Sequence, residues 1–310
     1  MTSVLSVKNL RKVYPTKKGG YAALNSISFS LKKGEILGLL GPNGAGKTTT
    51  IHLLLTTLKP TSGEIFYFGK ELYKHRSEIL KDVVFASTYI SLPWRLTLGQ
   101  NLQVFGRLYG LSPKFLSKRI DELLERFGIL EKKNDEVSTL SAGQITRLVL
   151  AKAFMVRPKV VLLDEPTASL DPDIAKEVRE FILQERDRDG TSILFTSHNM
   201  SEVTAVCDRA LFLQKGEIIA DDLPERLARS VSSTKLRLVV GEKMQIAQGI
   251  AHRMNFTHEI DHHTLQVHLE EKLIAPFLMQ LAKEEVEYSA IEIIESTLED
   301  YFLAMTKGLR

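Results

Sequence analysis

The stretch from residue 41 to residue 49 has the composition and spacing of a loop that binds phosphate. Its residues are Gly41, Pro42, Asn43, Gly44, Ala45, Gly46, Lys47, Thr48 and Thr49. Glycines tolerate positive φ and close approach, so backbone N–H groups can converge on an anion. Lys47 can reach the β- and γ-phosphates of a nucleotide, and the Thr48 hydroxyl can bind Mg²⁺. The loop therefore predicts nucleotide binding.

The segments on either side of this loop have the patterns that it requires. Residues 35–40, which are uncharged after Glu35, predict a buried strand. Residues 48–58 predict a helix whose N-terminal dipole faces the phosphates. A glycine-rich turn that matches by chance is the alternative, and the order of strand, loop and helix disfavours it.

Two carboxylates follow a second apolar run. Residues 160–163 predict a buried strand, and Asp164 and Glu165 come directly after it. Open α/β sheets bind their ligands at the carboxyl ends of such strands. We expect Asp164 to hold Mg²⁺ through water and Glu165 to polarise the water that attacks the γ-phosphate. Without the phosphate loop, an acidic strand end leading into a loop would be the better interpretation.

Two aromatic or imidazole side chains are further candidates for the same site. His198 follows a predicted buried strand at residues 191–196 and could bind the γ-phosphate or position the attacking water. Tyr14 ends a predicted edge strand at residues 4–13 and could stack on adenine. That strand is expected to form an antiparallel hairpin with residues 27–31. A lone histidine or a tyrosine at a strand end is more often structural.

The length of 310 residues is sufficient for about two domains. We expect an α/β nucleotide-binding domain at residues 1–228, with an antiparallel β subdomain and a helical insertion at about residues 88–157. A serine-rich linker and a small α+β domain at residues 229–310 follow. In that domain, Ser296 and Glu299 match a capping box that begins a helix. Its histidines favour a polar surface over a metal site.

The composition limits the partners and the compartment. The net charge of +3 is too balanced to indicate nucleic acid or anionic lipid. A single cysteine, Cys207, excludes an internal disulfide and fits a reducing cytosol. No signal peptide and no apolar run long enough to span a bilayer is found. Any membrane role must therefore act through a partner.

Taken together, these motifs resemble the ATP-binding subunits of ABC transporters over roughly residues 3–225. Residues 140–144 and 169–171 complete the resemblance as the signature and the loop after the acidic pair. It implies a P-loop ABC ATPase fold, with ATP and Mg²⁺ as cofactors. It also implies that two such domains face each other head to tail. The simplest assembly of this kind is a homodimer. Ser141, Gly143 and Gln144 then act in the partner's ATP site, and Asp171 is a further nucleotide-site residue.

The resemblance further implies a cytoplasmic ATPase at the inner face of the membrane, coupled to an integral membrane permease. The ending at residues 291–303 is similar to that of subunits paired with ABC-2-type exporters of drugs or polysaccharides. An alternative is a soluble ABC-family switch that acts on ribosomes or nucleic acid. Such relatives commonly have two ATPase domains or long charged insertions, and neither is found here. A scaffold without turnover is disfavoured by Glu165 and His198.

Three positions near the predicted site bear on coupling. Ser87 stands where the family usually has a glutamine that contacts Mg²⁺, so we expect weaker metal coordination or altered coupling with hydrolysis retained. Ala142 replaces a commoner glycine, which leaves Ser141 and Gly143 available for phosphate. Trp94, the only tryptophan, either contacts the permease or fixes the helical insertion to the core.

Overall fold

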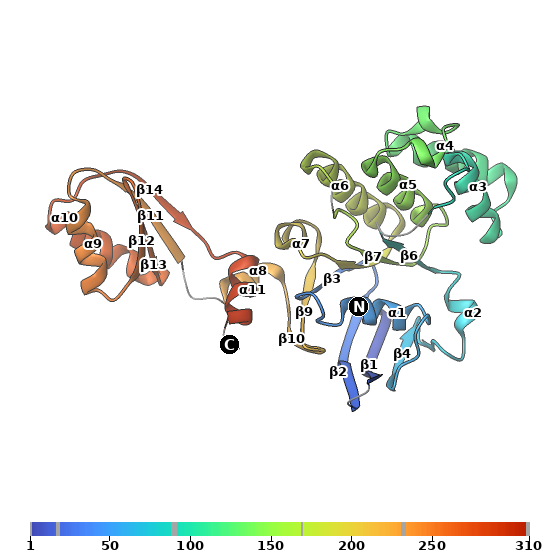
Figure 1. Ribbon diagram of the computed structural model, residues 1–310, viewed down its shortest axis with the longest axis horizontal. Coiled ribbons are helices and arrows are strands. Elements are labelled where there is room, and N and C mark those ends of the chain that lie inside the picture. The colour runs from blue at the N-terminus through green and yellow to red at the C-terminus, as the bar shows by residue number, and fades with distance from the viewer. Residues whose placement is uncertain (1, 17–18, 88–91, 169, 231–233, 308–310) are drawn as a thin grey trace. The chain divides into compact units, whose positions relative to one another are not determined.

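The structure is a computed structural model that describes residues 2–16, 19–87, 92–168, 170–230 and 234–307. The chain forms two compact units, Met1–Leu223 and Pro224–Arg310 (Figure 1). The helix α8 (Pro224–Arg229) belongs to the second unit, so the division falls slightly before the boundary expected from the sequence. Much of the expected serine-rich linker, residues 231–233, lies outside the described residues. No helix in the described part of the chain combines the length and apolarity needed to cross a membrane.

A six-stranded sheet with the order β10-β9-β3-β8-β7-β6 forms the centre of the first unit. Its strands are β3 (Ile36–Leu40), β6 (Val83–Ser87), β7 (Val160–Asp164), β8 (Ser192–Thr196), β9 (Arg209–Gln214) and β10 (Glu217–Asp222). All neighbouring pairs are parallel except β9 and β10. Every residue of β3 and β8 is buried, which explains their continuous apolar sequences. The parallel strands therefore end at one edge of the sheet.

An antiparallel sheet with the order β2-β1-β4-β5 forms a second layer. Its strands are β1 (Ser3–Thr16), β2 (Gly19–Lys32), β4 (Ser62–Tyr67) and β5 (Lys70–Glu71). The expected hairpin is confirmed by the pairing of β1 with β2. The expectation of an edge strand at residues 4–13 is wrong, because β4 pairs with the other side of β1. An alternating sequence pattern indicates which face of a strand is buried. It does not indicate whether the strand has one or two neighbours in the sheet.

The helix α1 (Lys47–Leu54) lies between these two sheets. Its Ile51 and Leu54 belong to one buried core with Leu5 of β1 and Leu39 of β3. The helix ends before the expected residue 58, since Thr56 has a φ of 60°, outside the helical region. Packing on both sides fixes the helix, and with it the loop that joins it to β3.

Besides α1, the first unit contains six α-helices among its described residues. They are α2 (Arg76–Ile79), α3 (Leu98–Leu108), α4 (Pro113–Arg126), α5 (Ala142–Phe154), α6 (Pro172–Asp189) and α7 (Met200–Val206), with short 3₁₀ helices at Leu130–Lys132 and Val137–Thr139. The first part of the expected helical insertion, residues 88–91, lies outside the described residues. Helices α3, α4 and α5 gather at one end of this unit, away from β1, β2 and β4 (Figure 1).

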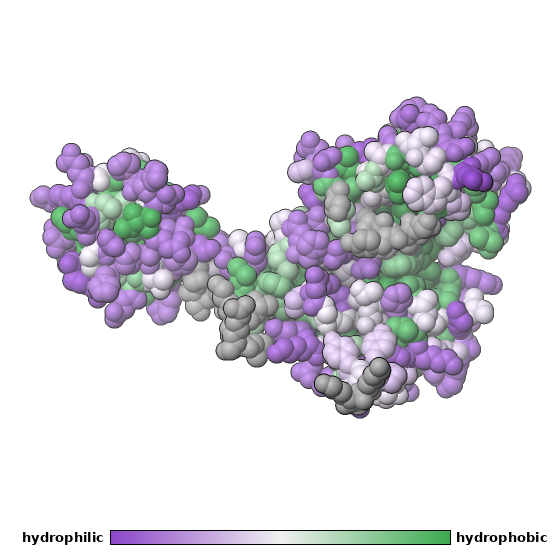
Figure 2. Space-filling model, in the orientation of Figure 1, coloured by the Kyte–Doolittle hydropathy of each residue, from purple (hydrophilic) through white to green (hydrophobic). Residues whose placement is uncertain are grey.

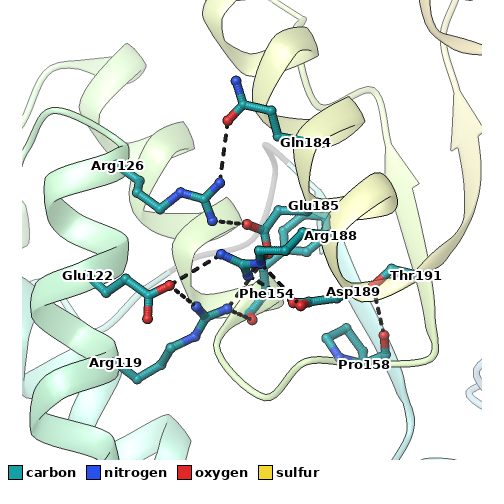
Figure 3. Close-up of polar contacts among 10 residues, drawn as sticks. All are labelled: Arg119, Glu122, Arg126, Phe154, Pro158, Gln184, Glu185, Arg188, Asp189 and Thr191. Atoms are coloured by element: carbon teal, nitrogen blue, oxygen red, sulfur yellow. Dashed lines mark hydrogen bonds and ion pairs between the residues drawn. The ribbon is translucent and has the colours of Figure 1, made fainter.

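A buried ionic cluster joins α4 to α6 (Figure 3). Glu185 of α6 is fully buried and pairs with Arg119 and Arg126 of α4 and with Arg188 of its own helix. The Nη2 of Arg119 also donates to the Phe154 carbonyl at the end of α5, at 3.0 Å. Arg119 is only 1% exposed, so its charge depends on these partners for solvation. The cluster thus holds the helical insertion against the α/β core.

The second unit contains a four-stranded antiparallel sheet with the order β12-β13-β11-β14. Its elements after α8 are β11 (Thr234–Val240), α9 (Met244–Arg253), β12 (Thr257–Asp261), β13 (Thr264–Leu269), a 3₁₀ helix at Glu271–Leu273, α10 (Ile274–Lys283), β14 (Tyr288–Ile294) and α11 (Leu298–Lys307). The βαββαβ order with this pairing is a ferredoxin-like arrangement. Leu236, Leu238 and Phe277 are central to its separate core. Its surface is largely hydrophilic in Figure 2.

The final helix has a capping box one residue later than expected. Asp300 N–H donates to the Thr297 hydroxyl, and Thr297 N–H donates to the Asp300 carboxylate, at 3.2 and 2.9 Å. The expected pair of Ser296 and Glu299 is therefore wrong. A physical reason is that Asp300 also accepts from Lys235 of β11 at 2.8 Å, which ties this register to the sheet.

Glu185→Ala should lower the free energy of unfolding of the first unit by about 3–5 kcal/mol, because it leaves the Arg119 charge buried and poorly compensated. Urea denaturation followed by circular dichroism measures this loss. Glu177→Ala is the matched control, since its 2.6 Å pair with Arg147 leaves the Glu177 side chain 63% exposed. The control should cost under about 1 kcal/mol. Equal losses in the two variants would contradict the importance of the buried cluster.

Candidate functional site

The predicted phosphate loop joins the carboxyl end of β3 to α1. Gly41, Gly44 and Gly46 have φ values of 150°, 79° and 114°, which favour glycine. A Cβ atom at Gly41 would lie 2.1 Å from the Leu213 carbonyl oxygen, and one at Gly46 would lie 2.7 Å from the Ala23 carbonyl oxygen. Only glycine fits these two positions without displacement of the backbone around them. The carbonyl groups that surround Gly41 and Gly46 therefore shape the loop as a narrow turn.

Lys47 begins α1 and lies inside this loop. Its Nζ donates to the carbonyl oxygens of Gly41 and Pro42 at 2.6 and 3.3 Å. Burial lowers the pKa of the Lys47 ammonium, and the negative charges of Glu165 and Asp164 partly oppose this effect. The two carboxylates thus act electrostatically on the lysine of the loop. Asn43, Thr48 and Thr49 are at least partly accessible around it, whereas Ala45 is buried.

The register of the central sheet places the acidic pair beside the loop. Leu39 of β3 pairs with Thr196 of β8, and Thr196 pairs with Asp164 of β7. The Thr196 hydroxyl donates to Asp164 Oδ1 at 2.7 Å and accepts from the Glu165 N–H at 3.1 Å. Thr196 therefore fixes both acidic residues, a role that sequence analysis missed. Its only signal was its position at the end of a predicted strand.

Glu165 and His198 come together at this edge. The His198 Nδ1 lies 3.1 Å from Glu165 Oε2, although the two residues follow different strands. Glu165 has a φ of 50°, an uncommon conformation for a residue with a side chain. Its N–H donates to both the hydroxyl and the carbonyl of Thr196, and these bonds stabilise that conformation. A carboxylate and an imidazole so placed can bind one water and accept its proton.

Ser87 lies at the end of β6 in register with Asp164. Ser87 is only 4% exposed, so it is buried at the end of the strand. The next four residues, 88–91, are outside the described part of the chain. Ser87 thus borders the acidic edge, as its sequence position indicated.

The signature residues begin α5. Ser141 is its N-cap, and its hydroxyl accepts from the Gln144 N–H at 3.3 Å while its own N–H donates to Gln144 Oε1 at 3.0 Å. Ser141 is exposed, and a Cβ at Gly143 would lie 3.1 Å from Ile174 of α6. Asp171 is the exposed N-cap of α6, and the neighbouring Ser169 lies outside the described residues. An exposed helix N-terminus is suited to an anion.

Tyr14 lies on β1, opposite Tyr21 of β2. The ammonium of Lys12 lies 5.2 Å from the centroid of the Tyr14 ring. The Tyr21 hydroxyl donates to the Gly44 carbonyl at 3.5 Å, so the hairpin reaches the phosphate loop. Sequence analysis missed Tyr21, because the expected hairpin paired residues 4–13 with residues 27–31 and did not include it.

The strand, glycine loop and helix, with an acidic pair at the end of β7 two strands away in the same sheet, define a P-loop nucleotide-binding protein. The ABC transporter family profile matches residues 24–168. The linearmycin resistance ATP-binding protein LnrL of Bacillus subtilis (strain 168) is 33% identical, with 98% of each chain covered. The doxorubicin resistance ATP-binding protein DrrA of Mycobacterium tuberculosis (strain ATCC 25618 / H37Rv) is 30% identical, with 97% of this chain and 92% of that protein covered.

A solved structure described as the ATP-binding subunit of an ABC transporter aligns with a TM-score of 0.67 and 26% identity, covering 74% of this chain and 93% of that one. The chain belongs to the ABC transporter family, as an ATP-binding subunit of the ATPase type. The family and the fold expected from the sequence are thereby confirmed.

Glu165→Gln should lower the rate of ATP hydrolysis by about 10²- to 10⁴-fold, because the amide cannot accept the proton of the attacking water. It should leave ATP binding intact, since the phosphate loop is unchanged. Phosphate release and binding of a fluorescent ATP analogue measure the two effects separately. Hydrolysis at the unsubstituted rate would exclude Glu165 as the base.

Proposed function

We propose that this chain hydrolyses Mg²⁺·ATP to power an exporter through a separate membrane permease. The observation that supports hydrolysis most directly is the 3.1 Å contact between Glu165 and His198 at the edge that also holds the phosphate loop. Support for export comes from relatives along nearly the whole chain, which are named for linearmycin resistance and doxorubicin resistance. A Nod factor export ATP-binding protein of Cupriavidus metallidurans is 32% identical over 99% of this chain.

The proposed chemistry depends mostly on placement. Lys47 and the amides of the loop stabilise the charge of the β- and γ-phosphates. The exposed Thr48 hydroxyl and the Asp164 carboxylate are hard oxygen donors of the kind that Mg²⁺ requires, and they would hold the ion. Bound there, Mg²⁺ would neutralise phosphate charge. Glu165 accepts a proton from water, and His198 positions that water.

Each ATP is proposed to be enclosed by two chains. Ser141, Gly143 and Gln144 of one chain bind the γ-phosphate held by the other, and Asp171 lies at the same interface. The exposure of Ser141 at the N-terminus of α5 supports this role. The chain has one copy of each motif, so a second ATPase domain is required, most simply a second copy of this chain.

The helical insertion is the proposed contact with the permease. Trp94, before α3, is 64% exposed, and Val104 and Leu108 of α3 are 51% and 78% exposed. Val104 and Leu108 are four residues apart and so share one face of α3. Exposed apolar side chains that lie side by side are typical of an interaction surface. Docking of this surface on a permease places the chain in the cytoplasm, at the inner face of the membrane. The alternative, a switch on ribosomes or nucleic acid, gains no support from these apolar residues.

Dimer formation can be tested in the hydrolysis-deficient Glu165→Gln protein. Size-exclusion chromatography should show a dimer that requires ATP, because closure traps nucleotide between chains. Adding Ser141→Arg should abolish this dimer while each chain still binds ATP, since a bulky side chain then occupies the interface. Ser117→Arg on the exposed surface of α4 is the matched control and should dimerise. A Glu165→Gln protein that stays monomeric with ATP would oppose the proposal.

The permease contact can be tested by affinity purification of the tagged chain from detergent-solubilised cells. We expect a membrane protein with several hydrophobic spans to co-purify, and Trp94→Ala with Leu108→Ser to reduce its recovery at least several-fold. Met279→Ser, which removes a 66% exposed apolar side chain from α10, serves as the control. Recovery of ribosomes or nucleic acid instead would favour the alternative function.

A further inference from the structure

A buried carboxylate that the proposed chemistry does not use lies next to the catalytic pair. Glu202 of α7 is 5% exposed and lines a pocket of about 350 Å³ together with Glu165 and His198. A carboxylate taken out of water is costly unless hydrogen bonds compensate for the lost hydration. The partners of Glu202 therefore indicate what this side chain does.

Both hydrogen-bond partners of Glu202 are neighbours of the catalytic residues. The Thr167 hydroxyl donates to Glu202 Oε2 at 2.6 Å, and the Ser197 hydroxyl donates to the same oxygen at 2.9 Å. Thr167 follows Glu165 by two residues, and Ser197 directly precedes His198. One oxygen atom thus joins the loop after β7 to the loop after β8.

The chemistry of a carboxylate fixes the direction of the hydrogen bonds that Glu202 makes with the two loops. An ionised carboxylate only accepts hydrogen bonds, so the Thr167 and Ser197 hydroxyls both point toward it. The Ser197 hydroxyl in turn accepts from the Asn199 N–H at 3.0 Å. The second oxygen, Oε1, lies 3.8 Å from Arg179 Nη1 of α6. Thr167 and Ser197 are 5% and 3% exposed, so water offers them no ready alternative partner.

We propose that Glu202 is a positioning residue that sets the distance between Glu165 and His198. This inference rests on the proposed function, in which those two residues act on the attacking water. Glu202 contacts neither nucleotide nor water in this proposal. It fixes the two loops, and the 3.1 Å approach of His198 to Glu165 follows from their separation.

The central test is steady-state ATP hydrolysis by Glu202→Ala, with nucleotide affinity measured in parallel. Loss of the junction should lower kcat by up to about 100-fold, because reacting groups displaced by about 1 Å lose that much. The KM and Kd for ATP should change less than twofold, since the hydrogen bonds of Glu202 lead to the loops after β7 and β8. Glu202→Gln should recover most of kcat, because its amide oxygen can accept from both hydroxyls.

A second variant tests the path through which Glu202 acts. Thr167→Val removes one hydroxyl with little change of volume and should lower kcat by a smaller factor. Adding it to Glu202→Ala should cause almost no further loss, because both substitutions break the same link. If Glu202→Ala does not fold, Thr167→Val decides the question, because the positioning role predicts a lower kcat for this variant and a purely structural role does not.

Glu35 provides a matched control for stability. It is also a buried carboxylate, 7% exposed, and accepts from Arg209 Nε at 2.8 Å and from the Lys32 N–H at 2.6 Å. It precedes β3 and therefore lies at the opposite edge of the sheet from the phosphate loop. Glu35→Ala should lower thermal stability and leave kcat per folded molecule unchanged.

The outcomes separate this inference from the proposed function. An unchanged kcat in both Glu202→Ala and Thr167→Val, beside an inactive Glu165→Gln protein, would overturn the positioning role alone. A Glu35→Ala protein with the same loss of kcat would also overturn it. If the unsubstituted chain hydrolyses no ATP, or Glu165→Gln is fully active, the proposed function and this inference are rejected together.

Discussion

The in-register pairing of β3, β8 and β7 is the constraint on which the rest of the site depends. It sets Leu39, Thr196 and Asp164 side by side across the sheet. The loops that follow the three strands therefore begin at the same edge of the sheet. The phosphate loop follows the first strand, His198 the second and Glu165 the third. Because these strands are almost wholly buried, a shift of register would expose part of the core. The same burial that stabilises the sheet therefore aligns the proposed catalytic groups.

Much of this arrangement could be predicted from local sequence. The glycines of the loop are required by positive φ and by close backbone contacts, as at Gly41. These requirements produce a characteristic glycine spacing that can be recognised in the sequence. Continuous apolar runs identified β3, β7 and β8, since both faces of a parallel sheet are covered. The acidic pair and His198 could then be placed at strand ends, although their mutual distance could not. The edge assignment of β1 failed because pairing with the distant β4 leaves no local pattern.

Groups that act through distant partners were not predictable in this way. Thr196, Tyr21 and Glu202 have ordinary neighbours in sequence, and each takes its role from a residue on another element. Arg119 was not singled out by the sequence, because nothing local distinguishes it from the other basic residues of α4, yet it is buried against Glu185. The capping box at Thr297 shows the same limit, because Ser296 and Glu299 match equally well until Lys235 is placed beside Asp300. Local patterns indicate which elements form, and tertiary contacts select among equivalent residues.

The arginine cluster around Glu185 has a mechanical consequence. Arg119 and Arg126 of α4 share the Glu185 carboxylate of α6, so sliding of α4 along α6 separates opposite charges in a poorly hydrated interior. In the proposed function, a displacement of the helical insertion would therefore carry α6 with it. Because α6 starts at Pro172, directly after Asp171, that displacement arrives at its N-terminus. The cluster thus links the exposed apolar side chains that we propose as the permease contact to Asp171, which we propose to lie at the nucleotide interface.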